Sequence, residues 1–83
     1  LIKKLQGLPS KLPPKMYGAI ITVLILEGKM RPIADGEKGA VYRALCNIYN
    51  DSRYIGTRQG VAKYICAPSL SPLDINAAKA LLQ

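Results

Sequence analysis

One uncharged, mostly apolar segment near the N-terminus constrains this fold more than any other feature. It runs from Met16 to Leu26, follows Pro14 and is closed by Gly28. Its apolar residues surround the axis instead of forming a stripe, so it is a fully buried helix or a buried strand. The β-branched residues within it favour a strand. Its length, with proline at the first helical position and glycine as C-cap, favours a helix, which we predict.

Two further elements are predicted from capping residues and apolar spacing. A helix starts at Asp35-Gly36-Glu37, with Asp35 as N-cap, and its apolar stripe is Val41, Leu45 and Ile48. Residues 57–66 form either a short helix capped by Thr57 or the far arm of a hairpin.

A final helix opens at Ser71-Pro72 with Asp74 in its first turn, and its apolar face is Ile75, Ala78 and Leu82. We therefore expect a mainly α fold, a small bundle of four to five short helices. The alternative is an α+β fold with a short hairpin around residues 53–66. Residues 1–14 are assigned to a basic N-terminal arm and Pro-rich linker, and residues 15–83 to a single compact helical domain.

The composition argues against catalysis. The 83 residues include no histidine, which removes the commonest general base and the commonest zinc ligand. No Walker loop or nucleophile elbow is present, so we expect no enzyme activity, metal or cofactor. Cys46 and Cys66 are interpreted as buried thiols in preference to a disulfide, which favours an intracellular location.

The charge favours polyanionic partners. The formal net charge is +7, with a balance of +5 over residues 1–31 and +3 over residues 52–83. Nucleic acid, acidic lipid headgroups and acidic protein surfaces all fit such a surplus. The apolar run from Met16 to Leu26 is shorter than the roughly 20 residues of a transmembrane helix. A membrane surface is still a candidate partner. We predict phosphate contacts from these residues: Lys3, Lys4, Lys11, Lys15, Arg53, Tyr54, Arg58 and Lys63.

One motif carries a resemblance to a known family. Gly36-Glu37-Lys38-Gly39 has the Gly-x-x-Gly spacing with which KH domains clamp a nucleic-acid backbone, and it precedes a helix. A possible strand from Val61 to Cys66 and an Ala- and Leu-rich final helix also resemble that family, over residues 33–83. The chain departs from the pattern because residues 27–32 separate the apolar helix from the loop, and because Glu37 is negative. We interpret the glycines as shaping a loop and a helix start.

The helices starting near Glu37 and Thr57 also resemble a helix-turn-helix pair in which Arg58, Gln59 and Lys63 face the groove. The stretch between them, residues 51–56, is longer than the usual turn, so an ordinary bundle is favoured. The sequence thus predicts a non-enzymatic, basic, nucleic-acid-binding domain of a larger protein. The alternatives are a protein–protein or self-assembly module, such as part of a viral structural protein, and a secreted basic toxin-like subunit with its two cysteines bridged.

Overall fold

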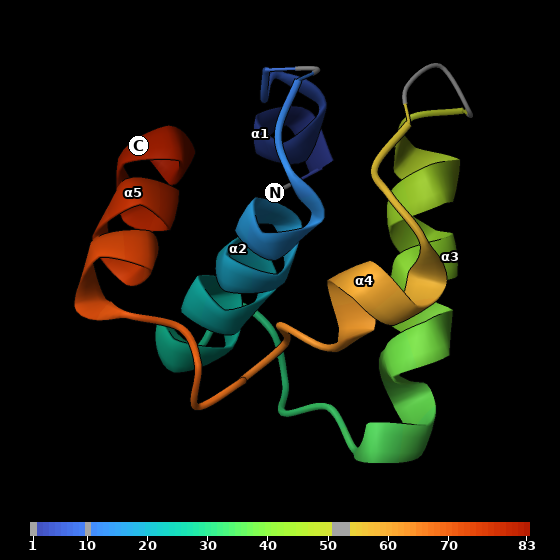
Figure 1. The fold of residues 1–83 in the computed structure, drawn as a ribbon. Helices are drawn as coiled ribbons and strands as arrows, with labels where there is room; N and C mark the ends of the chain where they lie inside the picture. Colours follow the sequence, from blue (N-terminus) through green and yellow to red (C-terminus); the bar gives the residue numbers. More distant parts are fainter. Residues whose placement is uncertain (1, 10, 51–53) are drawn as a thin grey trace.

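The computed structural model describes residues 2–9, 11–50 and 54–83, and its helices are arranged around one central helix (Figure 1). The elements are α1 (Ile2–Gln6), α2 (Pro14–Leu26), the 3₁₀-helix η1 (Asp35–Glu37), α3 (Lys38–Ile48), α4 (Arg58–Ala62) and α5 (Pro72–Leu82). The central α2 contacts α5 and α4, and α3 packs on α4 and α1. The described ranges contain no strand, which confirms the mainly α prediction. No helix within them is long and apolar enough to span a membrane.

The predicted apolar helix forms as α2 because its two ends are well defined. Pro14 occupies the first turn, where a missing N–H costs nothing. Gly28 closes the helix with a φ of +73°, a conformation that glycine adopts without strain. The N–H of Lys29 then donates to the Leu24 carbonyl at 2.9 Å. Residues 17–24 are all buried, so the middle of α2 has no face exposed to water.

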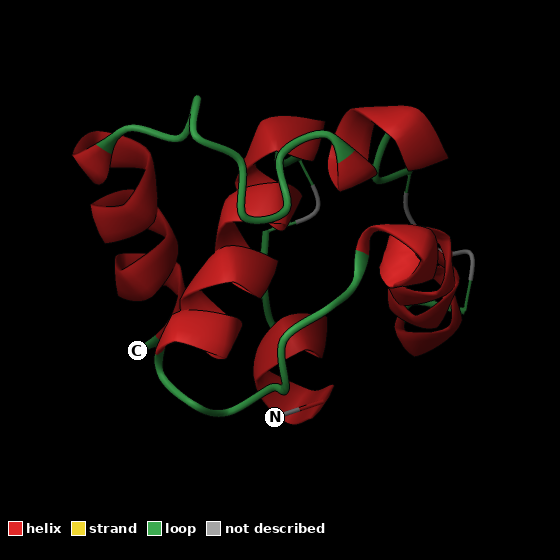
Figure 2. Ribbon diagram, turned by 90° about the horizontal axis from the view of Figure 1, so that it is seen from below, coloured by secondary structure: helices red, strands yellow, loops and turns green. Residues whose placement is uncertain are grey.

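The last helix, α5, packs against α2 (Figure 2). At their starts, Lys15 Nζ is 3.3 Å from Asp74 Oδ2, and near their ends Leu24 and Leu82 line one hollow. A capping box begins α5: the Ser71 hydroxyl accepts the Asp74 N–H, and the Asp74 carboxylate accepts the Ser71 N–H. The predicted start of this helix is therefore confirmed.

α4 and the turn after it press against α2 at a point where α2 has no side chain. A Cβ at Gly18 would lie 2.5 Å from the Tyr64 Cβ and 2.8 Å from the Tyr64 carbonyl carbon. One turn further along, the buried Thr22 hydroxyl donates to the Gly18 carbonyl at 2.8 Å and accepts the Cys66 N–H at 2.8 Å. Gly18 and Thr22 together hold the 63–66 turn on α2.

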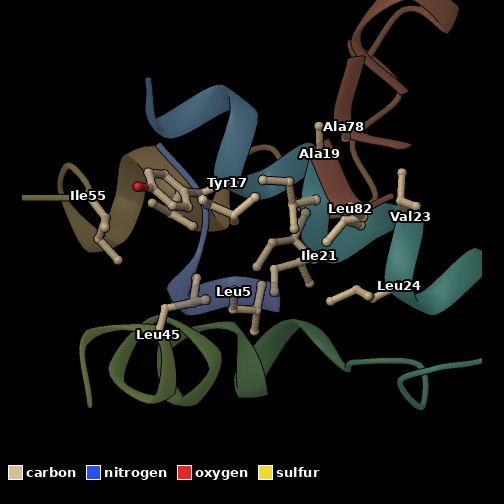
Figure 3. Close-up of a cluster of buried hydrophobic side chains, with 14 of the residues drawn as sticks. Leu5, Tyr17, Ala19, Ile21, Val23, Leu24, Leu45, Ile55, Ala78 and Leu82 are labelled. Atoms are coloured by element: carbon tan, nitrogen blue, oxygen red, sulfur yellow. The ribbon is translucent and has the colours of Figure 1, made fainter. Parts of the chain in front are cut away.

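Tyrosine hydroxyls tie α3 to the rest of the fold. The Tyr49 hydroxyl donates to the Leu5 carbonyl at 2.7 Å, and the Tyr42 hydroxyl donates to the Gly56 carbonyl at 2.6 Å. The Tyr49 ring meets the Tyr17 ring edge to face, with 6.2 Å between centroids. Leu5 is buried in the same core as α2 and α3 (Figure 3), so α1 packs against the predicted helical domain.

Two predicted boundaries are wrong. α3 begins at Lys38, because residues 35–37 form a 3₁₀ turn first and the Glu37 carboxylate accepts the Ala34 N–H at 3.2 Å. Residues 57–66 are neither one continuous helix nor a hairpin arm. Thr57 caps α4 as predicted, by accepting the Gly60 N–H, but α4 ends at Ala62 and turns follow. The strand required by the KH resemblance is therefore absent from residues 61–66.

The cysteine prediction is also wrong in part. Both thiols are free, but Cys46 is half-buried and Cys66 is exposed. Cys66 stands in a turn with a φ of +54°, and its N–H is bound by Thr22. The backbone of this turn is fixed against the core, although Cys66 is an exposed residue.

Candidate nucleic-acid interface

The structure places the outlying predicted residues on exposed parts of the chain. Lys3 and Lys4 are exposed on α1, and Lys11 is exposed in the segment before α2. Tyr54, shortly before α4, is 77% exposed. Arg53 lies outside the described residues. Lys4 lines a hollow at the ends of α2 and α5, and none of the other predicted binding residues that the structure describes lines it.

Two of the predicted lysines meet at one aromatic ring that the predicted set omits. The Lys15 Nζ lies over the Tyr64 ring, 5.9 Å from its centroid, and the Lys63 Nζ lies 5.7 Å from the same centroid. Lys15 is in the first turn of α2, whereas Lys63 is the C-cap of α4. The ring is held in place because the Tyr64 backbone is seated against Gly18. Cation–π attraction favours this placement of both ammonium groups.

A second basic region lies between the start of α3 and α4, in a hollow of about 340 Å³. Gly36, Lys38 and Gly39 line one side of it, and Arg58 and Gln59 line the other. A Cβ at Gly39 would lie 3.4 Å from the Arg58 Cδ, so the glycine leaves room for the arginine stem. The Arg58 side chain thus lies beside the first turn of α3, where the helix dipole is positive.

Glu37, the acidic residue of the Gly-x-x-Gly loop, lines a different hollow. One Glu37 oxygen accepts the Ala34 N–H at 3.2 Å, and the other lies 3.9 Å from the Arg31 Nη2. The Glu37 side chain lines the hollow beside Arg31 and is not among the described side chains that line the Arg58 hollow. The negative charge that the sequence places in the Gly-x-x-Gly loop is therefore engaged elsewhere.

Asp74 is the carboxylate that approaches the lysine pair. Hydrogen bonds from Ser71, chiefly from its backbone N–H, hold the pKa of Asp74 below its usual value, and Lys15 adds to this effect. Asp74 is thus a helix cap as well as a partner of Lys15. Within the described part of the chain, Arg58 and Lys63 form no ion pair with a carboxylate.

This arrangement suits the binding of a polyanion. A guanidinium offers a planar fork to phosphate oxygens, an amide adds a neutral donor, and lysines add mobile point charges. The short α4 carries Arg58 at its start and Lys63 at its end, so the two basic regions are about 8 Å apart along its axis. Lys38, Gln59 and Tyr64 become part of the surface only through the packing of α3, α4 and α2.

Comparison with known proteins adds no relative. The chain matches no protein-family model, no curated protein and no solved structure. Among the described residues, no three side chains of the types that hold metal ions gather in one place. The interpretation of function therefore rests on the chemistry of the surface.

Proposed function

We propose that this protein is a non-enzymatic nucleic-acid-binding module that contacts phosphates through the surface around α4. This surface, called the α4 face below, consists of Lys15, Lys38, Arg58, Lys63 and Tyr64. The observation that carries the proposal is the gathering of basic side chains around one short helix, with two ammonium groups at one ring and Arg58 beside Lys38. Such a concentration of like charge repels itself, and a bound polyanion offsets that repulsion.

The two halves of the α4 face have different roles in this proposal. The hollow beside Arg58 receives a phosphate, because the guanidinium and the Gln59 amide flank it and the glycine backbone gives close access. The half-buried Tyr64 ring, with a lysine at 5.9 Å and another at 5.7 Å, holds the neighbouring phosphate and offers an edge or face to a base. This mode of binding is electrostatic and tolerant of sequence.

The proposal predicts a salt dependence of known size. If Lys15, Lys38, Arg58 and Lys63 each neutralise one phosphate, log K falls with log salt with a slope of about −3 for a single strand and about −4 for duplex DNA. Fluorescence anisotropy with labelled single- and double-stranded RNA and DNA, titrated with salt, measures this slope. A slope near zero contradicts phosphate contacts of this kind.

A pair of charge-reversal variants tests the location of the binding surface. Arg58→Glu with Lys63→Glu changes the α4 face, whereas Lys29→Glu with Lys79→Glu makes the same change in net charge elsewhere. We expect the first pair to weaken binding at least tenfold more than the second. Equal losses in the two pairs would show that only the total charge matters and would refute the α4 face.

The other functions predicted from sequence have less support. Leu26 is 68% exposed and Leu73 is 80% exposed, which favours a protein partner. However, Leu26 is the last residue of α2, whereas Leu73 adjoins Asp74, which pairs with Lys15 at the start of α2. They therefore do not form one patch, and single exposed hydrophobic residues are common on protein surfaces. The toxin-like alternative lacks its bridge, because Cys46 and Cys66 are both free.

A further inference from the structure

The five tyrosines are the only aromatic residues of this chain, and they divide into two groups. Tyr17 and Tyr49 are buried in the core, and Tyr42 packs against it. Neither Tyr54 nor Tyr64 belongs to that core: the first is 77% exposed, and the second is half-buried beside two lysines. The core therefore accounts for three rings and leaves two at the surface, where a ligand can reach them.

These two rings stand on either side of α4 in the sequence. Tyr54 precedes Arg58, the first residue of α4, by four positions, and Tyr64 directly follows Lys63, the C-cap. Four residues span at most about 14 Å of extended chain. A strand with its bases stacked as in duplex DNA advances about 3.4 Å per nucleotide, so Tyr54 lies within about four nucleotides of Arg58. Rings and cations thus alternate along this part of the chain, within reach of one short strand.

Both rings are carried by backbone that is fixed against the rest of the fold. Ile55, which directly follows Tyr54, is buried, and the next carbonyl along the chain accepts the Tyr42 hydroxyl at 2.6 Å. The Tyr64 backbone is seated against Gly18 of α2. A surface ring on fixed backbone loses little conformational freedom when a ligand binds, so both rings are pre-organised for stacking.

The lysines beside Tyr64 can be drawn from the ring to a phosphate. Lys63 Nζ and Lys15 Nζ, at 5.7 and 5.9 Å from the ring centroid, are both close to the outer limit of about 6 Å for cation–π attraction, which is weak at exposed sites. Lys15 is shared with Asp74, 3.3 Å away. Lys63 is exposed on a flexible stem, and a phosphate carries a full negative charge. A bound strand therefore engages both groups, because a phosphate takes Lys63 and a base takes the ring.

We propose that the α4 face binds single-stranded nucleic acid, with unpaired bases stacked on Tyr54 and Tyr64 and phosphates at Arg58 and Lys63. This inference rests on the proposed function and adds to it the form of the strand. An unpaired base of any kind offers a face on which an aromatic ring stacks. A duplex fits this surface less well, because its base faces are covered by neighbouring base pairs and only its phosphates and groove edges are accessible.

The test compares probes that share a phosphate backbone and differ in their bases. Fluorescence anisotropy near physiological salt measures binding of the protein to labelled oligothymidylate, to an abasic strand of the same length, and to the oligothymidylate–oligoadenylate duplex. The abasic strand keeps every phosphate and loses only stacking, so we expect it to bind at least about fivefold more weakly. The duplex should also bind more weakly than the single strand. Oligouridylate, compared with its own duplex, distinguishes RNA from DNA as the source of the strand.

Substitutions of the two rings locate the stacking. Tyr54→Leu and Tyr64→Leu should each weaken oligothymidylate binding about fivefold or more and leave binding of the abasic strand unchanged. Tyr54→Phe and Tyr64→Phe keep the ring and should bind as the parent does. Tyr54 is exposed, so its variants test the inference even if Tyr64→Leu disturbs the turn. The chain has no tryptophan, so tyrosine fluorescence is a second readout, which oligothymidylate should quench and the abasic strand should not.

The outcomes separate this inference from the proposed function. Equal affinities for oligothymidylate and the abasic strand, or tighter binding of duplexes, would overturn base stacking, while a steep salt dependence would still support phosphate contacts. An unchanged affinity for oligothymidylate in either folded leucine variant would also overturn it. No binding of any probe, even at low salt, would refute the proposed function together with this inference.

Discussion

Replacing Gly18 by alanine tests the closest helix contact in the fold. The added Cβ would lie 2.5 Å from the Tyr64 Cβ and 2.8 Å from the Tyr64 carbonyl carbon, whereas ordinary contact begins at 3.4 Å. Neither atom is the end of a flexible side chain, so α2 and the 63–66 turn must separate. The same separation stretches the 2.8 Å hydrogen bond from the Cys66 N–H to the Thr22 hydroxyl.

The size of the effect follows from opposing contributions. Overpacking of this kind costs about 1–3 kcal/mol, and the weakened hydrogen bond costs about 1 kcal/mol. Alanine favours a helix interior over glycine by about 1 kcal/mol, which opposes them. We therefore expect Gly18→Ala to lower the free energy of unfolding by about 2 kcal/mol. For a domain of this size, that corresponds to a fall in Tm of about 8–16 °C.

Urea and thermal unfolding followed by circular dichroism at 222 nm measure the change. Gly36→Ala is the matched control, because a Cβ at Gly36 meets nothing within 4 Å. Its stability should stay within about 1 kcal/mol of the parent. A Gly18→Ala variant as stable as the parent would refute the close contact between α2 and Tyr64. We also expect this variant to bind nucleic acid less tightly, because the Tyr64 ring moves with its backbone.

Three further predictions concern hydroxyl and carboxylate groups. Tyr49→Phe removes the donor to the buried Leu5 carbonyl and should lower the free energy of unfolding by about 1–3 kcal/mol. Tyr17→Phe should leave the free energy of unfolding unchanged or raise it by about 1 kcal/mol, because the buried Tyr17 hydroxyl has no hydrogen-bond partner among the described residues. A larger loss of stability for Tyr17→Phe than for Tyr49→Phe in urea unfolding would contradict both assignments. The pKa of Asp74 lies below its ordinary value of 3.8, so its charged form stabilises the fold at neutral pH and that contribution is lost as the pH falls through the lowered pKa. Asp74→Asn should therefore show a smaller loss of stability on acidification than the parent, and an identical pH profile would argue against the capping box.

The sequence predicted some of the residues of the candidate site but not the full set. Arg58 and Lys63 stood out as basic residues near a predicted helix, and Lys15 as part of a basic N-terminal region. Lys38 was not singled out as a binding residue, because its position beside Arg58 depends on the packing of α3 on α4. Tyr64 directly follows Lys63 in the sequence, but the approach of Lys15 from another helix is a long-range contact. Contacts of this kind have no local sequence signal.

Local sequence chemistry by itself determined most of the helices. Pro14 begins α2 and Gly28 follows its end, Thr57 caps α4, and Ser71 with Asp74 caps α5. These signals are local because a capping interaction involves only residues a few positions apart. Apolar spacing also indicated which residues face inward.

Only the tertiary structure decided how these helices meet. The need for glycine at position 18 comes from Tyr64, far along the chain. The separation of Lys4 from the α4 face follows in the same way, because α1 is placed by Leu5 and Tyr49. The physical reason is that caps and periodicity act within a few residues, whereas close approach, burial and charge clustering join residues from distant parts of the chain.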